Sequence, residues 1–323
     1  MKHMKEKHQL NADLPNGNTT RIYYEQAIRE ARPTEENEVD FKLLEAARLG
    51  DHEKIKVLLS HNANPSKDSS QGRTALHLAA QAGHEILARI LINNGEDIHK
   101  KSSNGDTAFF IAVKAGHQSI VNLLLENGQD VHERSNHTSG FSALYIAVKH
   151  KHIDVVRTLL KHGGADEPVW GFSNALIVGI ETNQDEMVAL LLRSGYDVNK
   201  TSDRFSKNRT TPLHVAARSG PQMTKLILDA KPLIELCAGN WTDPMTPLVT
   251  AITHGDFSNN REVVKLLRDA GAAISPVEWE KLSPERQRHY ADLFPLPIPP
   301  LTAKRYDPWN PPSPTIPHNN MHS

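Results

Sequence analysis

The sequence predicts an all-α solenoid of helix-turn-helix units joined by projecting loops that resemble β-hairpins. Two observations predict this fold class: a short motif recurs at a nearly constant interval, and each copy is followed by a second helical pattern. The motif is clearest in "TTPLHVAARSG" from Thr210 and in "RTALHLAAQAGH" from Arg73. Since neither short helix of a unit can bury its apolar face alone, successive units must stack on one another.

A small residue in the first helix of each unit marks the repeat. The intervals between successive markers are 33, 33, 35, 32, 37 and 35 residues. The markers are Ala46, Ala79, Ala112, Ala147, Gly179, Ala216 and Ala251. Intervals in this range are typical of stacked repeats. We therefore predict seven units, which together occupy residues 40–274.

The second helix of each unit is predicted by the spacing of its apolar residues. In the third unit, Ile120, Leu123 and Leu124 recur at i, i+3 and i+4, which places them on one buried stripe. In most units a glycine follows this pattern: Gly95, Gly128, Gly163, Gly195 and Gly271. Glycine is favoured there because the residue that ends a helix often adopts the left-handed conformation.

The motif resembles the ankyrin repeat. "TPLHVAARSG", "TALHLAAQAGH" and the unit endings "DVN" and "DIH" carry the resemblance, which covers residues 40–274, about three quarters of the chain. It implies a concave face and projecting loops, here called fingers, that bind proteins and carry out no reaction. Lys151 and Asn183 replace the turn glycine, and Gly179 replaces the marker alanine. The fifth unit also lacks the motif histidine, so we expect it to be the least regular.

Charge and composition restrict the partners. The chain has 37 Lys+Arg against 38 Asp+Glu, so no overall field attracts nucleic acid or an anionic membrane. No apolar run approaches the ~20 residues of a membrane span, and the N-terminus lacks the apolar core of a secretory signal. The single cysteine, Cys237, cannot form an internal disulfide. We therefore expect a monomeric intracellular protein, cytoplasmic or nuclear, that binds a protein partner and neither nucleic acid nor membrane.

The motif histidines admit a structural and a chemical interpretation. His77 and His214 could serve as metal ligands or general bases, or could hydrogen-bond to backbone in the turn that enters the first helix, with Thr74 or Thr211 capping it. The same position holds Phe110, Tyr145 and Val249 in other units. A position that accepts aromatic and aliphatic residues is a packing position. We predict the structural role, and no metal or cofactor site.

Two short stretches resemble parts of an esterase. "HGG" from His162 is similar to an oxyanion loop, and "GFSNA" from Gly171 to a nucleophile elbow. In that fold the two motifs belong to different strands, whereas here one short loop separates them. The chain also contains no Walker sequence, no paired CxxC and no kinase signature. The sequence therefore predicts no catalytic residues, and we expect the protein not to be an enzyme.

The flanks of the repeats differ in character. Residues 1–39 are polar, with an amphipathic pattern over residues 20–31 that predicts a capping helix. Residues 275–294 hold two helix starts, at Ser275 and Ser283, each followed by proline at the first helical position. Residues 295–323 are proline-rich, which favours an extended or disordered tail. We expect the helical flanks to close the ends of the solenoid.

The fingers contain the candidate partner-binding residues. The longest is "NKTSDRFSKNRTT", and two others carry tryptophan. Exposed aromatic and arginine side chains dominate interface energetics. The candidates are Trp170, Arg204, Phe205, Lys207, Arg209 and Trp241. Each aromatic could instead pack against the base of its own finger.

These features predict a scaffold that binds a partner protein. One alternative is an adaptor subunit of an enzyme complex such as a ubiquitin ligase, in which the C-terminal helices would recruit the machinery. The chain shows no leucine- and cysteine-rich box of the kind that such adaptors carry after their repeats.

A modification site is a further hypothesis. "LLRSGYDVN" resembles the leucine-to-asparagine spacing recognised by the asparaginyl hydroxylase of ankyrin repeats, which would make Asn199 the acceptor. The alternative is that Asn199 only hydrogen-bonds within its own loop.

Overall fold

The helices of the chain form seven consecutive pairs in the computed structural model. It describes residues 35–135, 140–164, 174–202, 210–235, 237, 245–254 and 257–294, without the side chains of 35–38 and 257–259. The pairs are α2 (Glu35–Leu49) with α3 (His52–Ser60), α4 (Ala75–Ala82) with α5 (Glu85–Asn93), α6 (Ala108–Ala115) with α7 (Gln118–Glu126), α8 (Ala143–Lys149) with α9 (Ile153–Lys161), α10 (Ala175–Glu181) with α11 (Asp185–Arg193), α12 (Pro212–Ser219) with α13 (Pro221–Asp229), and α14 (Pro247–Thr253) with α15 (Phe257–Asp269).

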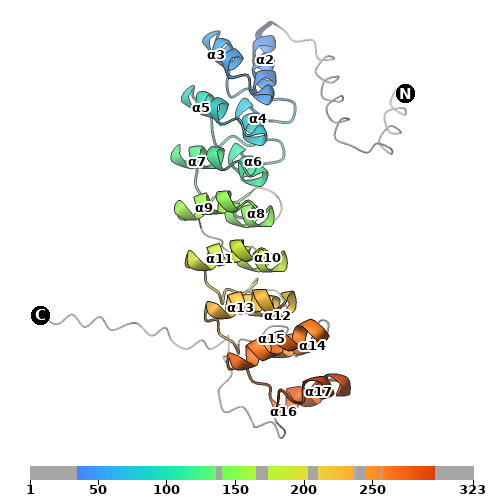
Figure 1. The fold of residues 1–323 in the computed structure, drawn as a ribbon. Helices are drawn as coiled ribbons and strands as arrows, with labels where there is room; N and C mark the ends of the chain where they lie inside the picture. Colours follow the sequence, from blue (N-terminus) through green and yellow to red (C-terminus); the bar gives the residue numbers. More distant parts are fainter. Residues whose placement is uncertain are drawn as a thin grey trace, which may run out of the picture.

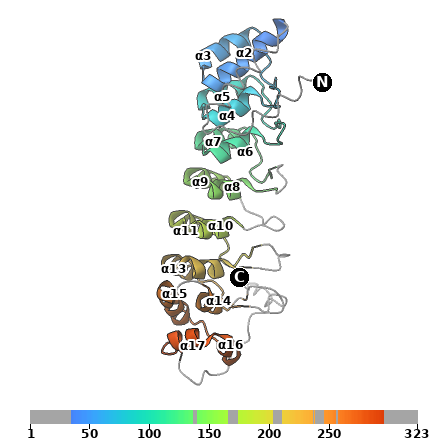
Figure 2. The same cartoon turned by 90° about the vertical axis from the view of Figure 1, so that its right-hand side faces the viewer.

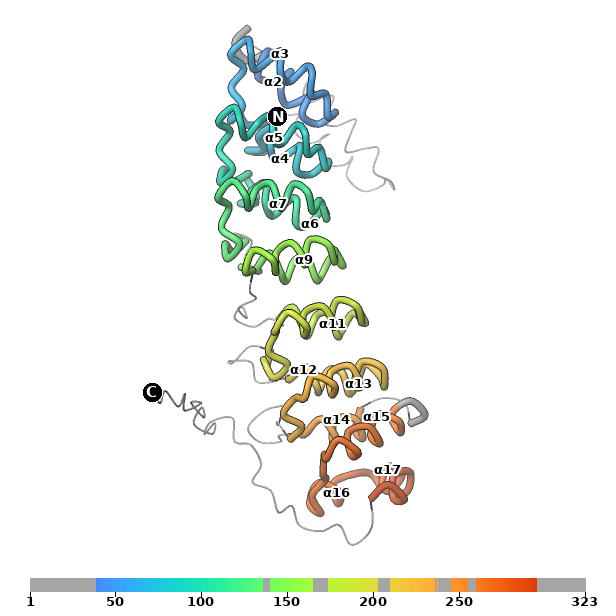
Figure 3. Tube along the Cα trace, turned by 60° about the vertical axis from the view of Figure 1, so that its left-hand side comes forward, coloured from blue at the N-terminus to red at the C-terminus, as the bar shows by residue number. Residues whose placement is uncertain are grey.

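The pairs stack into an elongated solenoid with two layers. The first helices of the units, α2 to α14, pack on one another in one layer, and the second helices, α3 to α15, form the other (Figure 1). Figure 3 shows the second helices following one another along the length of the stack. The described parts of the fingers project to one side, beyond the first helices (Figure 2). The predicted all-α solenoid fold is confirmed.

The marker residues lie where the helices of a stack approach most closely. All six marker alanines are fully buried, as are Ile120 and Leu124 of the α7 stripe. At Gly179 a methyl group would lie 3.1 Å from Cγ2 of Val188 in α11. The fifth unit therefore uses glycine because α10 packs closer to its partner helix than an alanine allows without a shift.

The turn between the two helices of a unit explains why some units keep glycine. Gly116 has φ +82°, and a methyl group there would lie 2.6 Å from Nδ1 of His152 in the next unit. The same crowding joins Gly50 to His84 and Gly83 to His117.

The turn after α8 has no histidine of the next unit to accommodate. Lys151 adopts φ 64° there, and Gln184 occupies the position of the histidine. A larger residue is therefore tolerated at this turn at the moderate strain of a left-handed conformation.

Two further helices follow the seventh unit at the C-terminal end of the stack. α16 (Pro276–Lys281) begins at the predicted helix start with a reciprocal cap: Ser275 Oγ accepts from the Glu278 amide at 3.2 Å, and Glu278 Oε2 accepts from the Ser275 amide at 2.9 Å. α17 (Pro284–Tyr290) ends with the fully buried Tyr290. Arg261 of α15 donates to the backbone oxygen of His289 at 2.6 Å. The Arg261 bond joins α17 to the seventh unit.

Candidate functional site

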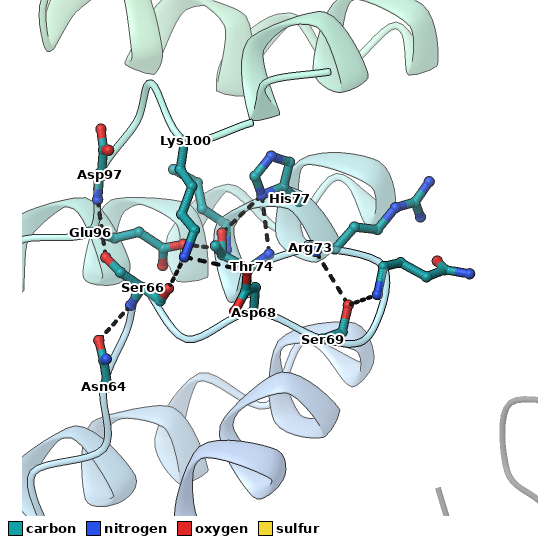
Figure 4. Close-up of polar contacts among 12 residues, drawn as sticks. Asn64, Ser66, Asp68, Ser69, Arg73, Thr74, His77, Glu96, Asp97 and Lys100 are labelled. Carbon is teal, nitrogen blue, oxygen red and sulfur yellow. Dashed lines mark hydrogen bonds and ion pairs between the residues drawn. The ribbon is translucent and has the colours of Figure 1, made fainter. Parts of the chain in front are cut away.

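The motif histidine of the second unit joins two successive units. His77 Nδ1 accepts a hydrogen bond from the Thr74 amide at 3.1 Å, at the start of its own helix. Its Nε2 lies 3.1 Å from the backbone oxygen of Asp106, which precedes the first helix of the third unit. Because a carbonyl can only accept, Nε2 carries the proton and the imidazole is neutral. The predicted structural role is confirmed, and the bond to Asp106 extends it to the neighbouring unit. Figure 4 shows His77 beside Thr74.

His214 repeats this arrangement near the C-terminal end. Its Nδ1 lies 2.6 Å from Oγ1 of Thr211, and its Nε2 lies 2.9 Å from the backbone oxygen of Met245 in the seventh unit. Only 2% of the side chain is exposed. Burial lowers the pKa of His214 from 6.5 to about 4, so the ring is neutral at physiological pH.

The fifth unit achieves the same connection without a histidine. Asn174 Oδ1 accepts from the Ile177 amide at 2.9 Å, which caps α10, and its Nδ2 donates to the backbone oxygen of Lys200 at 2.9 Å in the next finger. One asparagine thus replaces the threonine and histidine pair of the second and sixth units. The departure of this unit from the motif is a substitution of side chain rather than a loss of the contact.

A buried carboxylate lies beside the first of these histidines, and the sequence did not predict it. Glu96 Oε1 accepts from the Leu76 amide at 3.2 Å, at the positive end of the α4 dipole. Burial nevertheless raises the pKa of Glu96 to about 7, although the Thr74 side chain and Lys100 favour its charged form. Lys100 itself donates to the backbone oxygen of Ser66 at 2.5 Å (Figure 4). In the third unit Gln129 occupies this position.

We expect Glu96→Gln to stabilise the protein at alkaline pH. The native pKa is raised, so the folded chain binds more protons than the unfolded chain between pH 4.5 and about 7, and the wild type loses stability as pH rises through that window. At pH 8 the variant should be more stable by about 3 kcal/mol, and the difference should shrink near pH 4. Urea unfolding over this pH range measures it, with the exposed Glu262→Gln as control. A constant difference at all pH values would contradict the assignment.

The bases of the fingers are closed by backbone hydrogen bonds. The Ser102 amide donates to the Asp106 oxygen at 2.9 Å, and the Ser202 amide to the Thr210 oxygen at 2.9 Å. Successive fingers are also joined, because the Ser103 amide donates to the Gln71 oxygen at 2.9 Å. The sequence-predicted binding residues lie outside the described residues: Trp170, Arg204, Phe205, Lys207, Arg209 and Trp241.

The first helices present two parallel rows of side chains, which we call the first-helix face. The residues just before the marker form an apolar row that is partly buried in three units and nearly fully buried in two: Leu78, Ile111, Ile146, Val178 and Val215. The residues two positions after the marker form an exposed row: Arg48, Gln81, Lys114, Lys149, Glu181 and Arg218. The two rows are three residues apart on each helix, so they lie side by side. No element of the described chain covers the exposed row.

The centre of this face is rich in aromatic and basic groups. Phe141 stacks on Tyr145 with ring centroids 4.4 Å apart, and Lys149 Nζ lies 5.7 Å from the Phe141 ring. His150 lies close to both Lys114 and Lys149, and burial together with these cations lowers its pKa. The face therefore carries local positive charge although the whole chain is nearly neutral.

A shallow hollow of about 570 Å³ lies on the opposite layer, between α9 and α11. Its lining includes Leu160, Lys161, Leu190 and Ser194. Arg157 of α9 is paired with Glu186 of α11 at 3.3 Å. The hollow presents no buried polar side chain to a ligand and is a weaker candidate than the first-helix face.

Three further possibilities concern Asn199, metal binding and membrane insertion. Asn199 Oδ1 accepts from the Leu233 amide of the next unit at 2.7 Å, so its side chain bridges units rather than only its own loop. Within the described ranges, no group of three His, Cys, Asp or Glu side chains could hold a metal ion. None of the helices described is both long and apolar enough to span a membrane.

Comparison with known proteins supports the arrangement. A family model described as ankyrin repeats, with three copies, matches residues 43–135, 87–169, 132–202 and 176–277. Among solved structures, the crystal structure of the human ASB11 ankyrin repeat domain is similar, with a TM-score of 0.58 and 24% identity over 72% of this chain and 99% of that one. At this identity the likeness shows the fold alone. A search of curated proteins found no match.

Proposed function

Because the chain belongs to the ankyrin-repeat family, we propose that it is a non-catalytic scaffold that binds a partner protein through the first-helix face and the fingers. One observation carries the proposal. The side chains of the exposed row, Lys114 and Lys149 among them, project from rigidly packed helices and take no part in the core. Rigid helices that present exposed charged groups lose little backbone conformational entropy on binding.

The scaffold proposal includes a monomer in the cytoplasm or nucleus. The buried, neutral state of His77 and His214 supports a structural rather than catalytic role for the motif.

We propose residues 275–294 as the end cap of the solenoid, because Trp279, Tyr290 and Phe294 are buried against it. An adaptor would need a free surface on α16 and α17 for its machinery. A pull-down with residues 40–274 against the full chain separates the two, since a scaffold retains its partners without the C-terminal helices, whereas an adaptor loses its machinery.

The longest finger is expected to contribute to binding without contributing to the core. Its loop, residues 203–209, lies outside the described residues, but Ser202 and Thr210 close its base with a hydrogen bond of 2.9 Å. Changing Arg204 and Phe205 together to alanine should leave the melting temperature nearly unchanged, because surface changes away from the core have small effects. Affinity for the principal partner should fall by about 2 kcal/mol, as at an interface hot spot. Calorimetric titration measures this loss. Unchanged affinity for every partner recovered with the wild type would place recognition elsewhere.

We propose Asn199 separately as an acceptor for hydroxylation. Its side-chain oxygen accepts from the Leu233 amide, so modification requires this unit boundary to open for the enzyme. Mass spectrometry of the peptide containing Asn199, from cells that hold the hydroxylase, should show the addition of one oxygen atom. Absence of that mass, with a known ankyrin substrate modified in the same cells, would end the hypothesis.

A further inference from the structure

The exposed row of the first-helix face has an uneven charge pattern. From the N-terminal end it reads positive at Arg48, neutral at Gln81, positive at Lys114 and Lys149, negative at Glu181 and positive at Arg218. Equivalent positions of stacked units lie above one another, about 10 Å apart for packed helices. The face thus carries a regular row of charges with one reversal of sign, at the fifth of its six positions.

Within the described residues, the charges of this row have few partners of opposite sign. Gln81 is engaged by Arg73, whose Nη1 donates to Oε1 at 2.7 Å. Lys114 and Lys149 have no carboxylate within ion-pair distance among the described residues. Glu181 lies near enough to Arg218 for the cation to favour its charged form, although burial raises its pKa more strongly. Unpaired like charges on a rigid face repel one another, and a complementary partner relieves that repulsion.

The apolar row beside these charges restricts the kind of partner further. Ile111 and Ile146 are only partly buried and flank Lys114 and Lys149 on the same helices. A nucleic acid backbone offers uniform negative charge, which Glu181 would repel, and no aliphatic groups for the isoleucines. A protein segment can supply carboxylates, apolar side chains and one cation together.

We infer that the first-helix face binds a segment of a partner protein in which apolar residues alternate with carboxylates that face Lys114, Lys149 and Arg218, and in which a cation faces Glu181. This inference rests on the proposed scaffold function and adds the chemistry of the partner. Matching the 10 Å steps requires a carboxylate at about every third residue of an extended segment, or every seventh of a helix. The single reversal at Glu181 fixes the direction and register of the segment.

A peptide-display selection on the full chain tests the inference. Peptides enriched on the wild type should combine carboxylates with apolar residues. The double charge reversal Lys114→Glu with Lys149→Glu should weaken the best peptide at least about tenfold. Lys225→Glu, on the exposed side of α13, is the matched control and should leave the affinity unchanged. Glu181→Lys should select peptides that lack the cation. Circular dichroism shows that each variant remains folded.

The outcomes distinguish the inferred chemistry of the partner from the proposed scaffold function. Enriched peptides that are neutral or basic, or that bind the charge-reversed variant equally well, would overturn the acidic partner while leaving a scaffold. Tighter binding of a single-stranded oligonucleotide than of any peptide, lost in the double reversal, would assign the face to nucleic acid and overturn the inference. Recovery of no binding peptide, together with no protein partner for the full chain, would contradict the scaffold itself.

Discussion

Replacing Tyr290 with alanine is expected to detach α16 and α17 from the end of the solenoid. The Tyr290 side chain is fully buried, and its removal leaves a large cavity between α17 and the seventh unit. Loss of a buried aromatic side chain costs about 4 kcal/mol. In a stack where each unit contacts only its neighbours, this loss should appear first as local opening of the terminus. Amide hydrogen exchange of residues 276–294 should therefore accelerate far more than exchange in α6 or α8.

Tyr290→Phe is the matched control for this experiment. The Tyr290 hydroxyl is buried and has no hydrogen-bond partner among the described residues. Removing it while keeping the ring should not reduce stability, because an unsatisfied buried hydroxyl is itself unfavourable. If the alanine variant exchanged like the wild type, the two helices would contribute nothing to the end of the stack.

Replacing His214 with alanine is expected to weaken the boundary between the sixth and seventh units. The change removes the bonds to Thr211 and to the Met245 oxygen and leaves that oxygen without its donor. Two lost hydrogen bonds and a small cavity together cost about 3 kcal/mol at pH 7. Urea unfolding followed by fluorescence or circular dichroism measures the loss. His132→Ala, at an exposed position, should change stability little.

The pH dependence of stability provides a second test of His214. Its native pKa lies near 4, below the 6.5 of the unfolded chain, so the unfolded chain binds more protons between these values. This histidine's contribution is therefore complete above pH 6.5 and is lost as pH falls towards 4, by about 3 kcal/mol in all. The Glu96 effect has the opposite sign, so the single variants are needed to separate them. A His214→Ala variant with an unaltered pH profile would contradict the neutral, buried ring.

The repeat architecture could be predicted from the sequence because the residues that define it are required within each unit. A small marker such as Ala112 is needed wherever first helices pack closely, and a glycine such as Gly128 follows most second helices, so both recur with the period of the fold. The family and the all-α fold predicted from these residues are confirmed. Gly116 lies against His152 of the next unit, which explains why this turn keeps glycine. The sequence reveals this reason only once the units are stacked.

The site was less predictable than the fold for three physical reasons. Glu96 occurs in one unit alone, and its burial depends on how α4 and α5 close over it. The charge pattern around Lys149 and Glu181 becomes visible only when successive first helices are aligned in space. The finger residues, Arg204 and Phe205 among them, lie outside the described residues, so their role stays a prediction.

Hydrogen-exchange footprinting of the full chain with a partner identified by proximity labelling tests the central claim most directly. Binding through the first-helix face and fingers predicts slower exchange in residues 101–115 and 140–151 and in the fingers, with little change in α7 and α9. Protection confined to the second helices or to residues 295–323, with the first helices unchanged, would contradict the scaffold function assigned to this face.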